Sequence, residues 1–372
     1  MVTDINNRND QRIELLDSFR FIAILLVVLY HYYTRWTPPY YTQNEYPYGG
    51  TFAAYFQYGY LGVNFFFMIS GFVILYTLEK TSTYMSFILK RFIRLFPPML
   101  LCCLLTFLLV RFLDRANSFS VFHSKLYDFL PSLTFVNPGF WNSVIPAKKM
   151  DYIDGAYWTL HYEVTFYIVA GLIYFKTKGR FISNWLIFTS IIVLINALRV
   201  HFFPQNYFFA LLITWFPLAN QIIFFTVGII AYGFFFKKQM PPWSIMLACI
   251  LILFEYHHYL YDKTMVILLF LLTFLFAILA FAPNYLSFLK IKLVQRIGLI
   301  SYSVYLIHQF IGILLINKIS LWINYSPINI YIPIFVMILV IVFAECSYRF
   351  FEKPVSSFLK KILNKYIDAE KV

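Results

Sequence analysis

Ten stretches of the chain are apolar over about the length that a helix needs to cross a lipid bilayer, and they constrain the fold more than any other feature. They lie near residues 13–34, 59–79, 96–113, 157–175, 181–199, 209–236, 243–261, 264–283, 297–317 and 328–350. Hydrophobic residues make up 61% of the 372 residues and charged residues only 13%. A water-soluble domain has too little interior to bury that much apolar surface. The sequence therefore predicts an all-α fold, a polytopic membrane helical bundle with about ten transmembrane helices.

Basic residues collect in every second gap between these stretches, which predicts the orientation. The basic gaps and ends contain Arg8 and Arg12; Lys90, Arg91 and Arg94; Lys176, Lys178 and Arg180; Lys237 and Lys238; Lys290, Lys292 and Arg296; and Lys353, Lys360, Lys361 and Lys365. Lys and Arg accumulate in cytoplasmic loops, so both termini are predicted to be cytoplasmic. The net charge of +13 then reflects membrane topology rather than nucleic-acid binding. The first stretch lacks a small-residue cleavage site and is expected to be retained.

The four cysteines predict neither a metal site nor a redox site. Cys102, Cys103, Cys249 and Cys346 all fall inside apolar runs, and none has the C-x-x-C spacing. We expect them to be buried packing residues.

Arg20 and His31 bound an unbroken apolar run in the first stretch. Their separation of eleven positions places them within roughly 20° of one helix face and about 16 Å apart along the axis. An arginine in hydrocarbon costs roughly 2.5–3.5 kcal/mol even on the lenient insertion scale. We therefore expect both residues to face one groove, with an anion site at the inner end and a titratable imidazole at the outer end. The alternative is that Arg20 extends to the inner headgroups and His31 only caps the helix.

Arg91 and Arg94 lie three positions apart, on one helix face, in "ILKRFIRLFPPML". Pro97 and Pro98 follow them and are expected to open the third membrane helix. Paired guanidinium groups suit phosphate or pyrophosphate, although an ordinary cytoplasmic anchor has the same pattern.

Further polar residues occur within the apolar stretches. Glu163 lies in "YWTLHYEVTFY", His308 in "ISYSVYLIHQF", and Asn64 and Ser70 in "GVNFFFMISGF". A carboxylate at that depth needs a partner or stays protonated. Together these residues predict a polar cavity inside the bundle.

Six blocks of this sequence, in the same order, resemble those of a known family. They are an Arg-x10-His opening helix (Arg20 and His31), "GVNFFFMISGFVI", an Arg-x-x-Arg motif in "KRFIRLFPP", "WTLHYEVTFY" with Glu163, "ISYSVYLIH" with His308, and "FFEKP". The chain resembles the acyltransferase family 3 membrane proteins, bacterial O-acyltransferases that modify cell-surface glycans, over residues 12 to 357. It departs from the family pattern at Phe21, where glycine is frequent, and at Asn64, where aspartate is frequent. No charge-dependent role is therefore expected at position 64.

The resemblance implies a transmembrane acyltransferase domain over residues 1–357 and a short basic cytoplasmic tail over residues 358–372, in the bacterial cytoplasmic membrane. It implies acyl-CoA as the cytoplasmic donor, with acetyl as the usual acyl group, and no metal. The acceptor would be a carbohydrate hydroxyl on the outer side: O-antigen, capsule, exopolysaccharide, a peptidoglycan unit or a lipid-linked intermediate. The extra C-terminal hydrolase-like domain of some members is not expected.

The resemblance also implies roles for the two ends of the first helix and for the arginine pair. His31 is the expected general base for the acceptor hydroxyl. The expected ligands of the donor phosphates are Arg20, Arg91 and Arg94. The rise of about 16 Å between Arg20 and His31 is about the reach of the thioester arm of coenzyme A. A transient acyl group on His31 stays open.

The remaining candidates have less defined roles. Glu163 or Tyr305 is expected to orient the imidazole or the acceptor, and the residues do not decide between them. His308 is either a second polar wall or a relay. Ser70 and Trp158 are expected, with Tyr305, to contact the substrate.

A transporter or flippase for a small solute or glycan is the competing class, because polar residues in membrane helices also mark substrate paths. Many transporters have internal repeats and paired broken helices. The sequence has neither, apart from Pro217 in the sixth stretch.

Overall fold

The structure is a computed structural model that describes residues 14–36, 52–114, 124–202, 217–323 and 327–369. The longer helices are α2 (Glu14–Tyr30), α4 (Leu61–Glu79), α5 (Tyr84–Leu113), α8 (Trp158–Thr177), α9 (Phe181–Phe202), α11 (Ile222–Phe235), α12 (Pro242–His257), α13 (Lys263–Phe281), α16 (Phe310–Trp322), α17 (Ile332–Ser347) and α18 (Lys353–Ala369). The short helices are α3 (Ala53–Phe56), α6 (Phe129–Thr134), α7 (Pro138–Val144), α14 (Lys292–Leu299) and α15 (Ser301–Ile307). No strand occurs in the described part of the chain, which confirms the all-α prediction.

Six helical segments in the described ranges are long and apolar enough to cross a membrane, so the chain is a multi-pass membrane protein. They are Glu14–Arg35, Ala53–Glu79, Tyr84–Leu113, Gly155–Phe202, Lys263–Phe281 and Asn329–Leu363. A further pair, α15 and α16, passes the same criterion only if its two helices count as one span, with a bend of 61° between them. Helices α11 and α12 are apolar but shorter. The count of ten helices and the cytoplasmic placement of both termini stay predictions.

Helix α5 differs from its prediction at its start. It begins at Tyr84 rather than near residue 96, with Thr83 as its N-cap accepting a hydrogen bond from the Ser86 amide at 3.2 Å. Pro97 therefore lies inside the helix, where its missing N–H leaves the Ile93 carbonyl without its usual donor. The Ser356 hydroxyl of α18 donates to that carbonyl at 3.2 Å. This compensation keeps α5 helical and brings Arg91 and Arg94 within it.

Two glycines allow α4 and α11 to cross in close contact at the centre of the bundle. A Cβ at Gly71 would lie 2.0 Å from the Phe225 carbonyl oxygen, and a Cβ at Gly228 would lie 1.9 Å from the Met68 carbonyl oxygen. Each helix thus presents its glycine to the backbone of the other. Any side chain larger than hydrogen would force the two helices apart.

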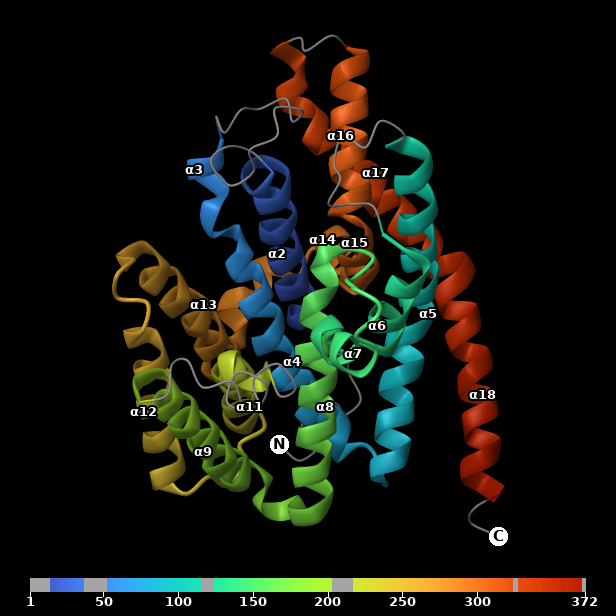
Figure 1. Ribbon diagram of the computed structural model, residues 1–372. Helices are drawn as coiled ribbons and strands as arrows, with labels where there is room; N and C mark the ends of the chain where they lie inside the picture. The colour runs from blue at the N-terminus through green and yellow to red at the C-terminus, as the bar shows by residue number, and fades with distance from the viewer. Residues whose placement is uncertain (1–13, 37–51, 115–123, 203–216, 324–326, 370–372) are drawn as a thin grey trace.

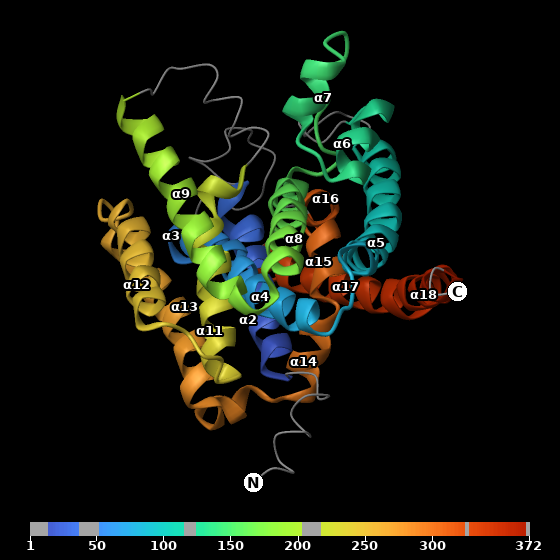
Figure 2. The same cartoon turned by 90° about the horizontal axis from the view of Figure 1, so that it is seen from below.

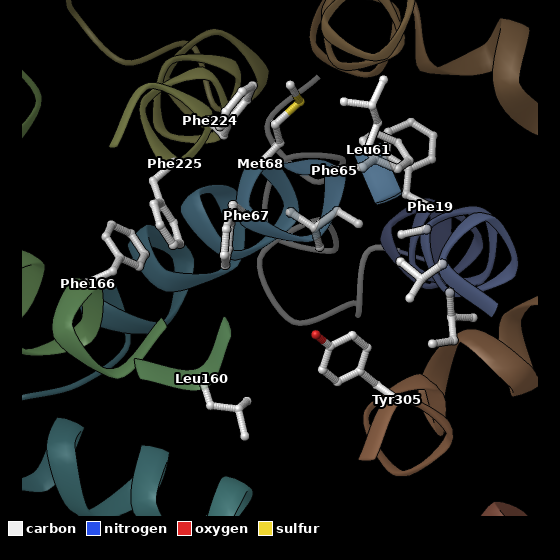
Figure 3. Close-up of a cluster of buried hydrophobic side chains, with 14 of the residues drawn as sticks. Phe19, Leu61, Phe65, Phe67, Met68, Leu160, Phe166, Phe224, Phe225 and Tyr305 are labelled. Carbon is white, nitrogen blue, oxygen red and sulfur yellow. The ribbon is translucent and has the colours of Figure 1, made fainter. Parts of the chain in front are cut away.

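Helices α2 and α4 lie at the centre of the molecule (Figures 1 and 2). Helices α11, α12 and α13 lie on one side of them, and α5, α15 and α17 lie on the other side. Helix α18 packs against the outer face of α5. Figure 3 shows the apolar core between these elements, with Phe19 of α2, Phe65 of α4 and Phe225 of α11 fully buried. The polar candidates therefore lie among the central helices, next to this core.

Candidate active site

A pocket between α2, α4, α5, α8 and α15 contains most of the polar residues that the sequence singled out. It encloses about 720 Å³ of space, counting the part open to solvent. Six of the nine candidate residues line it: Arg20, Ser70, Arg91, Arg94, Glu163 and Tyr305. Polar lining residues that the sequence did not single out are Thr159, Tyr167, Ser301 and Tyr302. The predicted polar cavity is thus present, and its lining comes from five separate helices.

Arg91 is the most buried of the three arginines, with 8% of its surface exposed. It donates to the Thr77 hydroxyl, and its guanidinium carbon lies 5.7 Å and 5.6 Å from the ring centres of Phe87 and Tyr167. Its Nε and Nη1 atoms have no hydrogen-bond partner among the described residues. Buried N–H groups of a charged side chain are costly to leave unpaired, so an anionic ligand would stabilise Arg91 in this position.

Arg20 and Arg94 add positive charge to the same pocket. Arg20 also forms an ion pair with Asp17 at 2.7 Å, which lies one turn earlier on α2. Arg94 is exposed and reaches the pocket from the next turn of α5 after Arg91. Among the described residues that line the pocket, Glu163 is the only acidic one. The described walls therefore favour an anion over a cation.

Glu163 has the partners that a carboxylate within a membrane helix requires. The Ser70 hydroxyl of α4 donates to its Oε1 at 3.2 Å, and the Tyr167 hydroxyl, one turn later on α8, donates to the same oxygen. Tyr167 also packs against Arg91 through its ring. Glu163 is thus joined to the arginine wall of the pocket through Tyr167.

His31 and His308 contact each other, although the sequence gave no reason to pair them. His31 is the first residue of a π-helical segment, His31–Arg35, that continues α2. Its Nδ1 lies 2.8 Å from the Val27 carbonyl oxygen and 3.3 Å from Nε2 of His308. His308 is fully buried, with its Nδ1 2.6 Å from the Tyr305 carbonyl oxygen. π-Helical turns often occur at functional sites, which fits the position of this pair.

Tyr305 connects the pocket with the histidine pair. Its ring lines the pocket and lies 5.3 Å from the His308 ring. Its hydroxyl donates to the Ala156 carbonyl at 2.8 Å and accepts from Thr159 Oγ1 at 3.0 Å. Figure 3 shows the Tyr305 ring on α15 directed toward the space between α4 and α8. His31 itself does not line the pocket; the link between the two is Tyr305, which lines the pocket and contacts His308.

A buried carboxylate holds the bend at which His308 lies. The two oxygens of Asp154 accept from the backbone amides of Ala156 at 2.8 Å and Phe310 at 2.9 Å. Asp154 therefore caps the turn that leads into α8 and also the start of α16. Complete burial raises the pKa of Asp154 to about 7. The sequence did not single out Asp154; the helix-start pattern Asp-Gly before the apolar run is the signal that could have found it.

Trp158 does not belong to the pocket lining, and its role as a substrate contact stays a prediction. Its side chain is 39% exposed and packs edge-on against Tyr162 at 5.3 Å. Five positions separate Trp158 from Glu163, which turns the two side chains about 140° apart around α8. Trp158 therefore points away from the face that lines the pocket.

The prediction for the cysteines was right for two of the four. Cys102 and Cys103 are buried, whereas Cys249 on α12 and Cys346 on α17 are exposed. In a membrane protein the outer face of a helix is apolar because it meets lipid, so an apolar context does not predict burial. No group of three or more His, Cys, Asp or Glu residues in the described ranges could hold a metal ion.

Comparison with known proteins gives a family match over nearly the whole chain. The model of an acyltransferase domain matches residues 13–344. The "O-acetyltransferase OatA" of Staphylococcus aureus is 25% identical over 376 aligned positions, which cover 91% of this chain and 56% of that protein. The "O-acetyl transferase" of Shigella phage Sf6 is 24% identical over 249 positions, which cover 66% of this chain and 70% of that protein. The chain thus spans about half the length of the staphylococcal relatives, and no solved structure matches it.

The family match includes the elements that build the pocket. Helices α2, α4, α5, α8 and α15, which contribute its lining, all lie within residues 13–344. The opening helix with Arg20 and His31, the arginine pair on α5 and the α15 segment with His308 are therefore part of the matched domain. This chain belongs to the acyltransferase family that the matched domain defines.

Proposed function

We propose that this chain is a membrane O-acyltransferase that moves an acyl group, acetyl in the first place, from acyl-CoA to a hydroxyl of a carbohydrate. The donor binds from the cytoplasmic side and the acceptor from the outer side of a bacterial inner membrane. The observation that carries the proposal is the convergence of Arg20, Arg91 and Arg94 on one pocket, one wall of which, Tyr305, packs against His308. The names of the relatives support O-acetyl transfer as the reaction class.

The arginines fit the phosphates of a coenzyme A donor. Guanidinium groups bind phosphate oxygens through paired N–H donors, and Arg91 has two buried nitrogens available for this. Arg94 lies on the same face of α5 and is exposed at the pocket, where it can meet an incoming ligand. The bound donor supplies a thioester, which is an acyl group activated for attack by a hydroxyl.

His31 is the proposed general base. It takes the proton of the acceptor hydroxyl while the hydroxyl oxygen forms a bond to the acyl carbon. It then returns the proton to the sulfur as the carbon–sulfur bond breaks, so that the products are an ester and a free thiol. A general base of this kind contributes about 10² to 10⁴ in rate. No acyl group needs to be carried on His31 in this sequence of events.

The other pocket residues position the reactants. Tyr305, held by the Ala156 carbonyl and Thr159, forms the wall that the acyl group passes on its way to His31. Glu163 is held by Ser70 and Tyr167, which places a carboxylate acceptor in the pocket for a substrate hydroxyl or amide. Both residues are fixed by hydrogen bonds before any ligand enters, and this lowers the entropic cost of positioning.

Transport of a small solute or glycan is the second candidate function. The bend of 61° between α15 and α16 favours it, because discontinuous helices surround substrate sites in many transporters. Binding separates the two functions: an acyltransferase binds acyl-CoA, whereas a glycan transporter has no reason to.

The test measures acetyl-CoA binding to the purified full chain by isothermal titration calorimetry. The double variant Arg91→Ala/Arg94→Ala should bind at least tenfold more weakly, because charge-assisted hydrogen bonds are each worth about 1.5–3 kcal/mol. The double variant Lys360→Ala/Lys361→Ala removes two exposed cations of α18 outside the pocket and is the matched control. Unchanged affinity in the arginine variant, or no binding by the unmodified chain, would contradict the proposal.

A further inference from the structure

We infer that His308 is a positioning residue that determines which nitrogen of His31 carries the proton. This inference rests on the proposed role of His31 as the general base and adds the atom at which the base acts. Three contacts among four residues carry it, and each involves a ring nitrogen at hydrogen-bond distance from an identified acceptor.

The contact of His31 with Val27 defines the protonation of His31. A backbone carbonyl oxygen can only accept a hydrogen bond, and it lies 2.8 Å from Nδ1 of His31. Nδ1 must therefore carry the proton, because an unprotonated nitrogen would place two lone pairs against each other. In the neutral ring the other nitrogen, Nε2, then holds the lone pair and is the basic atom.

The same reasoning defines the protonation of His308. Its Nδ1 lies 2.6 Å from the Tyr305 carbonyl oxygen, which again can only accept. The proton of neutral His308 is therefore on Nδ1, and its Nε2 is an acceptor. That Nε2 is the atom that lies 3.3 Å from Nδ1 of His31. The two rings meet edge to face, with an interplanar angle of 82° and ring centres 4.7 Å apart.

The Nδ1–H group of His31 thus faces two acceptors, the Val27 carbonyl oxygen and His308 Nε2. When Nε2 of His31 takes the proton of the substrate hydroxyl, the imidazole ring becomes a cation. The Val27 carbonyl oxygen and His308 Nε2 then both face the proton on Nδ1 of that cation. The hydroxyl oxygen keeps the electron pair that forms the new ester bond. His308 gains and loses no proton in this step; it orients the ring and stabilises its charge.

The fold keeps His308 in this orientation. The bend between α15 and α16 turns its ring toward α2, and Asp154 holds that bend through the Phe310 amide. Arg35 is the charged group that acts on the His31 ring, and Gln309 interacts with the ring through its side chain. Gln309 is thus a further hydrogen-bond partner of the ring, whereas Nε2 of His308 is the side-chain atom that lies at hydrogen-bond distance from Nδ1 of His31.

Nitrogen-15 NMR of the full chain labelled at histidine tests the tautomers directly, without any donor or acceptor present. The seven histidines are few enough to assign by variants, with His31→Ala and His308→Leu identifying the two rings. At pH 7.5 both rings should show the pattern of a proton on Nδ1, whereas a histidine in water prefers Nε2. A proton on Nε2 of His31 would overturn the inference.

Turnover of the His308 variants tests the consequence. His308→Leu removes the acceptor at similar size, and kcat should fall roughly 10- to 100-fold, the usual scale for the outer partner of a functional histidine. The KM for acetyl-CoA should stay the same, because the arginines that hold the donor are untouched. His308→Gln places an amide oxygen near the position of Nε2 and should restore part of the loss.

A matched control separates this role from a contribution to folding. His161 is also a buried histidine whose Nδ1 faces a backbone carbonyl, that of Phe135 at 3.2 Å, but it does not line the pocket. His161→Leu should lose no kcat per folded molecule. Full kcat in folded His308→Leu would refute the positioning role, and so would equal loss in the Leu and Gln variants. Full transfer by His31→Ala would instead refute the proposed function, so the two failures are distinguishable.

Discussion

Nδ1 of His31 lies 3.3 Å from Nε2 of His308, although 277 positions separate the two residues in the chain. His31 begins the π-helical segment that follows α2, and His308 lies at the bend between α15 and α16. Tyr305 packs against His308 and also lines the arginine pocket. Donor binding and proton transfer would thus occur on two sides of one tyrosine ring.

The spacing between Arg20 and His31 should matter as much as their identity. One alanine inserted between Ile24 and Leu25 turns one part of α2 by about 100° against the other. Arg20 and His31 then cannot both keep their places, and acetyl transfer should be lost even where the protein reaches wild-type levels in the membrane. An alanine inserted after Gly179, in the exposed turn between α8 and α9, is the control and should be tolerated. Full transfer by the α2 insertion variant would rule out the shared arrangement.

The crossing of α4 and α11 should tolerate no side chain at its glycines. Gly228→Ala places a methyl group 1.9 Å from the Met68 carbonyl oxygen and should destabilise the protein by about 1–3 kcal/mol or more, the cost of overpacking. Thermal unfolding in detergent measures this as a lower Tm. Gly179→Ala is the matched control, because no atom lies within 4 Å of its added methyl group. Equal Tm values for both variants would show that the crossing can relax.

Asp154 should make stability fall as the pH rises. Its pKa is raised to about 7 by burial, from an ordinary value of 3.8. Between about pH 4 and 7, Asp154 therefore keeps its proton in the folded state but has lost it in the unfolded state. The free energy of unfolding is thus highest at the acidic end of this range and falls as the pH rises. Each pKa unit corresponds to about 1.4 kcal/mol, so the upper limit of the effect is a few kcal/mol.

The variant Asp154→Asn cannot titrate at this position, and the measurement is the difference in Tm between it and the unmodified chain from pH 5 to pH 8. The unmodified chain should lose stability relative to the variant as the pH rises through 7. The difference removes the contributions of other groups that titrate in this range. A difference that does not change with pH would contradict the prediction.

The alternation of basic loops makes the orientation testable. Single cysteines at Ala147 and Lys178 should differ in their reaction with a membrane-impermeant thiol reagent added to whole cells. Ala147, in the segment between α7 and α8, should be labelled, and Lys178, in the turn between α8 and α9, should be protected. The exposed Cys249 and Cys346 are changed to serine first to remove background. The opposite labelling pattern would invert the proposed sides of donor and acceptor.

Local sequence patterns were enough to predict the parts of the site that lie on a single helix. The three-residue spacing of Arg91 and Arg94 placed both on one face of α5, and both line the pocket. A carboxylate within a membrane helix needs a hydrogen-bond partner, and this rule predicted partners for Glu163. The hydroxyls of Ser70 and Tyr167 are those partners. Local signals failed where distant contacts override them. Pro97 was expected to start a helix, but Ser356 of α18 compensates for its missing N–H and α5 continues through it.

By itself, the sequence determined that this chain is all-helical, that it is a membrane protein, and which ionisable residues lie within its helices, because hydrophobicity and charge are properties of each short segment. Only the tertiary structure decided which of those residues meet. The outward face of Trp158, the exposure of Cys346 and the capping role of Asp154 depend on where neighbouring helices lie. The contact between His31 and His308 depends on the bend after α15, on the carbonyl oxygens of Val27 and Tyr305, and on glycine crossings that bring the central helices close together. No single segment contains that information, since helix packing is set by the complementary surfaces of several helices at once.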